Sequence, residues 1–113
     1  MDKMDTVKIK LGLLDRLILP TILPKDGGLV QQVNTRGIIN KVEFTPEEAQ
    51  EFEMKDTEKG VMFNPAKARD IEVELTKSEV VLLQKSVDQL DKDQRINQEN
   101  LDLVLRIKQL NND

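Results

Sequence analysis

The chain of 113 residues has no cysteine, histidine, tryptophan or tyrosine. Without cysteine there is no disulfide, thiolate nucleophile or zinc finger, and without histidine no imidazole can act as a general acid or base. The only aromatic residues are Phe44, Phe52 and Phe63, fewer than a base-stacking platform for single-stranded nucleic acid usually needs. Carboxylate pairs are the acid–base groups that remain.

Long hydrophobic runs are absent too. The longest, residues 17–23, is interrupted by Pro20 and is far shorter than the ~20 apolar residues that cross a membrane. The first ten residues, MDKMDTVKIK, lack the apolar core of a signal peptide. Hydrophobic residues make up 38% of the chain and charged residues 34%, a balance typical of a folded domain. We therefore expect a cytoplasmic protein that forms a single domain over residues 1–113 and has no membrane partner.

Charge is unevenly distributed along the chain. The net charge is −4; residues 1–45 contain seven Lys/Arg against five Asp/Glu, and residues 46–113 contain ten against sixteen. An acidic surface repels phosphate backbones and anionic membranes. The composition therefore disfavours nucleic acid as a partner.

Two distant segments alternate apolar and charged residues, which is the period of a half-buried strand. In residues 6–11, TVKIKL, the charged face carries lysines. In residues 70–75, DIEVEL, the charged face carries glutamates. Opposite charges across neighbouring strands contribute about 0.2–1 kcal/mol per pair and favour one register. We predict that these two strands pair, the alternative being that each charged face is solvated separately.

The first predicted helix covers residues 13–23 and contains an internal proline. Pro20 should kink this helix or split it, because proline removes a backbone hydrogen bond, and Pro24 should end it. The following Gly27 and Gly28 have neither the preceding strand nor the Lys-Ser/Thr of a phosphate-binding loop. They are therefore interpreted as a turn, with Gly12 as a possible N-cap of the helix.

A second helix is predicted over residues 29–42. Gly37 in its middle lowers helix stability by about 1 kcal/mol relative to Ala, or marks a close helix crossing. The residues expected to face the core are Val30, Val33, Ile38, Ile39 and Val42.

The clearest local signal begins a short third helix that ends near Phe52. Thr45 is the expected N-cap, Pro46 takes the first helical position, and Glu47 and Glu48 lie in the first turn. Phe44 precedes the cap and can pack onto the turn that follows.

The second half of the chain is predicted to form a hairpin and two more helices. Residues 53–64 have the turn DTEKG between short apolar segments. Thr76 and Glu79 form a capping box before an apolar helix over residues 80–90, and Asn97 can cap the last helix. The fourth helix is expected to bury Val80, Leu83, Val87 and Leu90. The predicted fold class is α+β, about five helices packed on a small, mainly antiparallel sheet.

No catalytic, cofactor or metal site is predicted. A working carboxylate pair needs burial or a shared cleft to separate its pKa values. The four pairs of nearby carboxylates all lie on faces assigned to solvent: Glu47/Glu48, Glu51/Glu53, Glu72/Glu74 and Asp88/Asp91. The segment DKDQRINQEN spaces its acidic residues somewhat like a calcium loop but lacks the central glycine. We therefore expect a protein that is not an enzyme.

The last helix is apolar on more than one face, which indicates either burial in the core or a shared interface. In so small a domain we expect that both faces are not satisfied internally, so that one binds a partner or a second copy. The candidate interaction residues are Leu101, Leu103, Val104, Ile107 and Leu110 of this helix, together with Glu47 and Glu48.

The order of these segments resembles a group of short, uncharacterised proteins of phage and prophage-like genomes. The resemblance is carried by KIKLGLLDRLILPTILPKDGG, KVEFTPEEAQEF, IEVELTKSEVVLL and NQENLDLV, and covers most of the chain. Pro20 departs from the pattern, since an uninterrupted leucine-rich helix is expected there. The resemblance implies no activity and no functional residues, but it favours a phage-encoded accessory protein.

The leading hypothesis is a non-catalytic interaction protein, a phage-type regulator or inhibitor that binds a host protein in the host cytoplasm. One alternative is a structural protein that self-assembles through its C-terminal helix into a homo-oligomer. Another is a small-ligand binder with a pocket at an oligomer interface.

Overall fold

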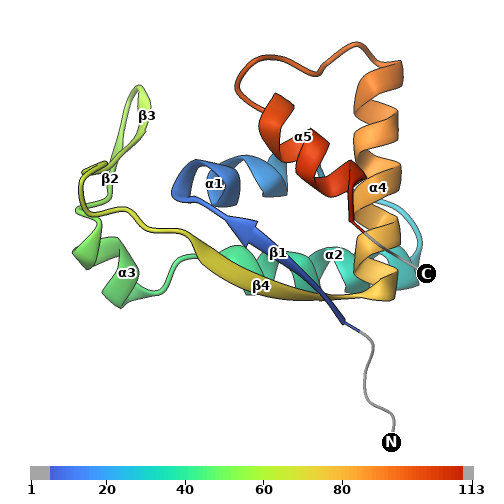
Figure 1. The fold of residues 1–113 in the computed structure, drawn as a ribbon, viewed down its shortest axis with the longest axis horizontal. Helices are drawn as coiled ribbons and strands as arrows, with labels where there is room; N and C mark the ends of the chain where they lie inside the picture. The colour runs from blue at the N-terminus through green and yellow to red at the C-terminus, as the bar shows by residue number, and fades with distance from the viewer. Residues whose placement is uncertain (1–5, 111–113) are drawn as a thin grey trace, which may run out of the picture.

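The computed structural model describes residues 6–110. Its elements follow in the order β1 (Thr6–Leu11), α1 (Leu13–Ile22), α2 (Leu29–Val42), α3 (Pro46–Glu51), β2 (Lys55–Thr57), β3 (Gly60–Met62), β4 (Ile71–Thr76), α4 (Lys77–Lys92) and α5 (Leu101–Lys108). The predicted α+β class with five helices is confirmed (Figure 1).

The strands form two separate antiparallel pairs, β1–β4 and β2–β3, so the expectation of a single sheet is wrong. The β2–β3 hairpin lies within the predicted residues 53–64, but its strands have three residues each and no buried side chain. Such a hairpin has no apolar face with which to extend the other sheet. It lies with α3 at the end of the molecule opposite α4 (Figure 1).

The predicted pairing of residues 6–11 with residues 70–75 is confirmed. Lys8 lies opposite Glu74 and Lys10 opposite Glu72, while the alternate positions of both strands face the core. The Lys8 Nζ lies 4.0 Å from a carboxylate oxygen of Glu72, and both side chains are well exposed. Because exposed ion pairs contribute little, the buried face is the main determinant of register.

Helix α1 is continuous through Pro20, so the predicted division into two pieces does not occur. The proline is the eighth of ten residues and the helix ends two residues later. The bond that it removes is the one to the Arg16 carbonyl, close to the helix end, where little helix remains to be disturbed. Gly12 takes the N-cap position, and its N–H donates to Asp15 Oδ2 at 2.9 Å.

Helix α2 presents a different face to the core from the one predicted. Thr35, Ile38 and Val42 are buried, whereas Val30 and Val33 are exposed. The buried stripe runs back from Val42 and Ile38 to Thr35 and the half-buried Gln31, at spacings of three and four residues. Val33 lies off this stripe, and Val30 is exposed in the first turn of the helix.

The close crossing at Gly37 is confirmed, because a Cβ there would lie 2.7 Å from Glu79 Oε2 of α4. The capping boxes at Thr45–Glu48 and Thr76–Glu79 are present, with reciprocal bonds of 2.9–3.1 Å. Asn97 does not cap α5 directly; it exchanges bonds with Asn100 in the turn before the helix, and α5 begins at Leu101.

Helix α4 is the centre of the core, because it contacts α1, α2, α5 and the β1–β4 sheet. Most of the side chains predicted to face inward do so, with Leu90 half-buried at the edge. The buried hydrophobic cluster comprises Ile9, Leu11, Leu19, Leu23, Ile38, Val42, Val73, Leu75, Val80, Leu82, Leu83, Val87, Leu103, Val104 and Ile107.

Candidate interaction surface

The apolar residues of α5 that were predicted to contact a partner lie mostly inside the protein. Leu103, Val104 and Ile107 are buried in the core cluster, and Leu101 and Leu110 are half-buried. The expectation that both apolar faces could not be covered within the chain is therefore not met. Of the apolar residues of α5, Leu105 is the exposed one.

Two polar side chains explain how α5 is held against the rest of the fold. Arg106 of α5 donates to the Lys10 carbonyl and to Asp15 Oδ2, each at 2.7 Å. Gln84 of α4 donates to the Ile107 and Leu110 carbonyls at 3.2 and 3.0 Å. Helix α5 is thereby fixed to β1, α1 and α4, and three of its predicted contact residues are not accessible to a partner.

The two predicted acidic contact residues, Glu47 and Glu48, have different environments. Glu47 is exposed, whereas Glu48 accepts two hydrogen bonds from the Arg16 guanidinium, at 2.8 and 2.9 Å. The side chains of Arg16 and Glu48 are only 2% and 14% exposed. The hydrogen bond from Arg16 lowers the pKa of Glu48 to about 2, with a further contribution from the Thr45 N–H. The Glu48 carboxylate is therefore paired inside the protein rather than presented to a partner.

Arg16 is the residue that sequence reasoning missed. Besides Glu48, it donates to the Val42 and Glu43 carbonyls at 2.9 Å each, and its guanidinium lies 4.0 Å from the centre of the Phe44 ring. This residue joins α1 to the end of α2 and the start of α3. Its spacing of three from Leu13 and from Leu19, which are both buried, is the signal that could have placed it inside.

The remaining carboxylate pairs lie on the surface, as expected. Glu51 pairs with Arg69 and Glu53 with Lys67, at 3.1 and 2.9 Å. The hydrogen bond from Lys67 lowers the pKa of Glu53. Within residues 6–110, no cluster of three or more acidic side chains could hold a metal ion, and each buried side-chain nitrogen or oxygen has a hydrogen-bond partner.

An apolar patch is exposed where the first turns of α2 lie beside the first turns of α4. Leu29, Val30 and Val33 of α2 are 82%, 74% and 61% exposed, and Val81 of α4 is 39% exposed. We call these four residues the α2–α4 patch. Other large exposed apolar side chains lie elsewhere, at Leu14, Met62 and Leu105.

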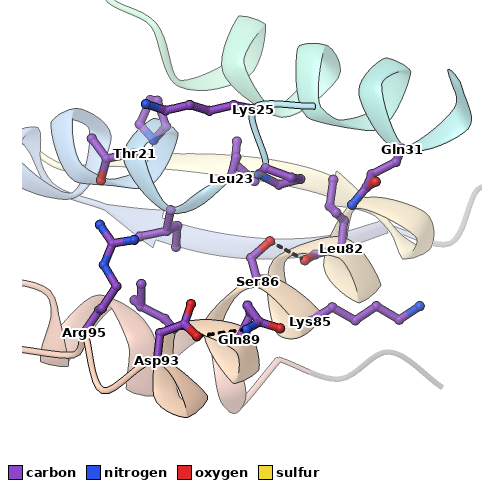
Figure 2. A pocket seen from close by; sticks show the side chains of 14 residues that line it. Thr21, Leu23, Lys25, Gln31, Leu82, Lys85, Ser86, Gln89, Asp93 and Arg95 are labelled. Carbon is purple, nitrogen blue, oxygen red and sulfur yellow. Dashed lines mark hydrogen bonds between the residues drawn. The ribbon is translucent and has the colours of Figure 1, made fainter. Parts of the chain in front are cut away.

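Two adjoining hollows extend this patch along α4. The first, about 550 Å³, lies between α2 and α4 and is lined by Val30, Gln31, Asn34, Lys77, Ser78, Val81, Leu82 and Lys85. The second, about 930 Å³, is bounded by residues 20–25 at the end of α1, by the second half of α4, and by Asp93 and Arg95 (Figure 2). Both are lined by Gln31, Leu82 and Lys85, so they adjoin along α4, and we call the two hollows together the α4 groove.

Within the described part of the chain, no helix has both the length and the apolarity to span a membrane. Comparison of the chain with protein-family models, with curated proteins and with solved structures finds no match. The resemblance to phage and prophage proteins thus stays a hypothesis from the sequence.

Proposed function

We propose that this protein is a non-catalytic interaction protein that binds another protein through the α2–α4 patch. The observation that carries the proposal is the exposure of Leu29, Val30 and Val33 on consecutive turns of a single helix. A surface helix ordinarily turns such residues to the core, and a contiguous exposed group of them is typical of interaction sites.

Energetics support a role in binding. Removing a Val or Leu side chain from water contributes about 1.5–3 kcal/mol. The patch lies at the lip of the α4 groove, because Val30 and Val81 line its first hollow. A partner that entered the groove would cover the patch at the same time. Burial of apolar surface and shape complementarity would then both contribute to the binding free energy.

The finer proposal is that the partner is a host protein and that this chain is a phage-type regulator or inhibitor. Its support is the resemblance carried by the sequence. The competing proposal, self-assembly through α5, would depend on Leu105, the exposed apolar residue of that helix. A ligand-binding function would depend on the larger hollow, whose lining comes from a single chain.

The test is quantitative capture of partners from bacterial lysate by two tagged variants with matched changes. Val30→Asp with Val33→Asp places two charges in the patch. Leu14→Asp with Leu105→Asp places two charges at exposed apolar positions of α1 and α5. Because all four side chains are exposed, both variants should keep the circular dichroism spectrum of the unmodified protein.

We expect the patch variant to lose a stoichiometric partner that the control variant retains. Loss of the partner with the control variant alone would contradict the assignment of the patch. Capture of only co-expressed copies of the same chain, lost in the Leu14/Leu105 variant, would favour self-assembly instead.

A further inference from the structure

We propose that the α4 groove accepts an amphipathic helix whose apolar stripe is bordered by acidic residues, and that its carboxylates pair with Lys25, Lys85 and Arg95. The inference rests on the proposed function and adds the chemistry of the partner segment.

The shape of the groove suits a helix. Its floor and one wall follow α4, a helix of 16 residues and hence about 24 Å long. The opposite wall is built from the end of α1, residues 23–25 and the start of α2. Helix-in-groove recognition uses apolar anchors repeated over several turns. Ile22 of α1 and Leu90 of α4, which are both half-buried, supply apolar contacts on the two sides of the larger hollow.

The charge of the groove is opposite to that of the whole molecule. Lys25, Lys85 and Arg95 line the larger hollow (Figure 2), are exposed, and have no ion pair or side-chain hydrogen bond to any residue in the described range. The one acidic lining residue, Asp93, accepts a hydrogen bond from Gln89 at 3.1 Å. Helix α2, LVQQVNTRGIINKV, contains no acidic residue.

Basic residues elsewhere in the fold are often already paired. Lys67, Arg69 and Arg106 each contact a carboxylate at 2.7–3.1 Å. In a chain of net charge −4, a hollow lined by three basic residues and a single acidic one is locally basic. Complementary charge across an interface increases the association rate and selects the partner.

Other occupants fit the groove less well. A single-stranded nucleic acid would need stacking surfaces, and none of the three phenylalanines lines either hollow. A second copy of the chain docked symmetrically would bring Lys85 near its own equivalent, which like-charge repulsion opposes. An acidic amphipathic helix satisfies both the apolar and the basic lining residues.

The test is selection from a displayed library of helix-forming 18-residue peptides, with all charge patterns represented, against the full chain. The same library is selected against Lys85→Glu with Arg95→Glu, and against the control Lys55→Glu with Lys59→Glu on the distant β2–β3 hairpin. The two variants change the net charge equally, and all four substituted side chains are exposed. We therefore expect both variants to keep the fold of the unmodified chain.

We expect peptides enriched on the unmodified chain to carry apolar residues at helical spacing with flanking Glu or Asp. Their affinity should fall about tenfold or more in the groove variant, stay within about twofold in the hairpin variant, and weaken between about 50 and 500 mM salt. The groove variant should itself enrich peptides with Lys or Arg at the flanking positions.

Three outcomes would overturn the inference. Enrichment of apolar helices without charge preference, sensitive to Val30→Asp, would leave the proposed function standing and remove the acidic requirement. Tighter binding of a single-stranded oligonucleotide than of any peptide would assign the cations to another class of partner. No enrichment of any helical peptide would remove the groove as a helix site, while the capture experiment still tests the patch.

Discussion

At the scale of single residues, Arg16 illustrates how a buried charge is accommodated. A buried guanidinium destabilises a fold unless its donors are satisfied, and Arg16 has two backbone carbonyls and the Glu48 carboxylate as acceptors. The bidentate geometry is the one that arginine favours with carboxylates. The pair therefore connects three helices through Arg16, the one buried basic residue within residues 6–110.

We predict that stability depends on pH through Glu48. Its folded pKa of about 2 lies below the ordinary value of 4.5, so its contribution is complete above about pH 4.5 and is lost as pH falls toward 2. Glu48→Gln should lower the free energy of unfolding by about 2–3 kcal/mol at pH 6 and by much less near pH 2. Urea unfolding followed by far-ultraviolet circular dichroism measures this, since the chain has no Trp or Tyr.

The matched control is Glu47→Gln, because Glu47 is exposed and adjacent. It should change stability by less than about 0.5 kcal/mol at either pH. An equal effect of the two substitutions would contradict the role of the Arg16–Glu48 pair.

We also predict that Gly37→Ala is destabilising, although Ala is favoured over Gly in helices by about 1 kcal/mol. The new methyl would approach Glu79 Oε2 at 2.7 Å. Glu79 is buried, and its other oxygen binds Lys41 Nζ and the Thr76 N–H, so it cannot move aside without losing these bonds. Chemical denaturation should show a loss of about 1 kcal/mol or more.

The same substitution in a Glu79→Ala background should raise stability, because the obstacle is gone and the helix preference of Ala remains. A stabilising effect of Gly37→Ala in the unmodified chain would show that the crossing of α2 and α4 is looser than described.

Residue-level prediction from sequence succeeded where the cause is local. Thr45 and Thr76 bond to groups three residues away, so their signal lies within one turn of sequence. The partners of Arg16 are 26 to 32 residues away, and no local pattern encodes them. For that reason Glu48 was assigned to the surface.

At the scale of elements, the ends of α3 and α4 share an uncommon feature. Glu53 and Gln94, which follow these helices, have φ of 58° and 56°, a conformation that side chains other than Gly adopt at a cost of about 1–2 kcal/mol. After α4, the Arg95 N–H bonds to the Leu90 carbonyl at 3.0 Å, which is the longer bond of a helix-ending motif that favours Gly.

We predict that Gln94→Gly stabilises the protein by about 0.5–1 kcal/mol, because Gly removes the strain at positive φ. Thermal unfolding monitored by circular dichroism provides the measurement. Gln94→Ala serves as the control and should give no gain, since Ala keeps the Cβ. Equal effects of Gly and Ala would show that the gain has another cause.

Element-level prediction depended on which period is visible in the sequence. The strict alternation of residues 6–11 and 70–75 predicts a strand and no other element, and the predicted pairing of the two strands is confirmed. The apolar residues of α2 can be grouped into more than one stripe, and the predicted core residues did not all belong to the same one. The buried stripe was not recognised because it includes Thr35, a polar residue that does not indicate burial in the sequence. Val30 and Val33, predicted as core, thus became the basis of the proposed binding surface.

At the scale of the whole molecule, α5 belongs to the core, and the start of α2 is where apolar side chains are exposed instead. We predict that Leu103→Asp lowers the free energy of unfolding by about 3 kcal/mol or more or prevents folding, since it places a charge in the core. Leu105→Asp on the same helix should change it by less than about 0.5 kcal/mol, because Leu105 is exposed. Urea unfolding compares the two; a folded, stable Leu103→Asp variant would contradict the burial of α5.

The location of the proposed binding surface is tested most directly by titrating the isotope-labelled protein with the tightest library peptide and recording amide chemical-shift changes. We expect the largest changes in residues 23–34 and 77–95, which border the α4 groove, and little change in the β2–β3 hairpin. Changes confined to the exposed side of α5 around Leu105, with α2 and α4 unaffected, would contradict the assignment of the α2–α4 patch and the groove.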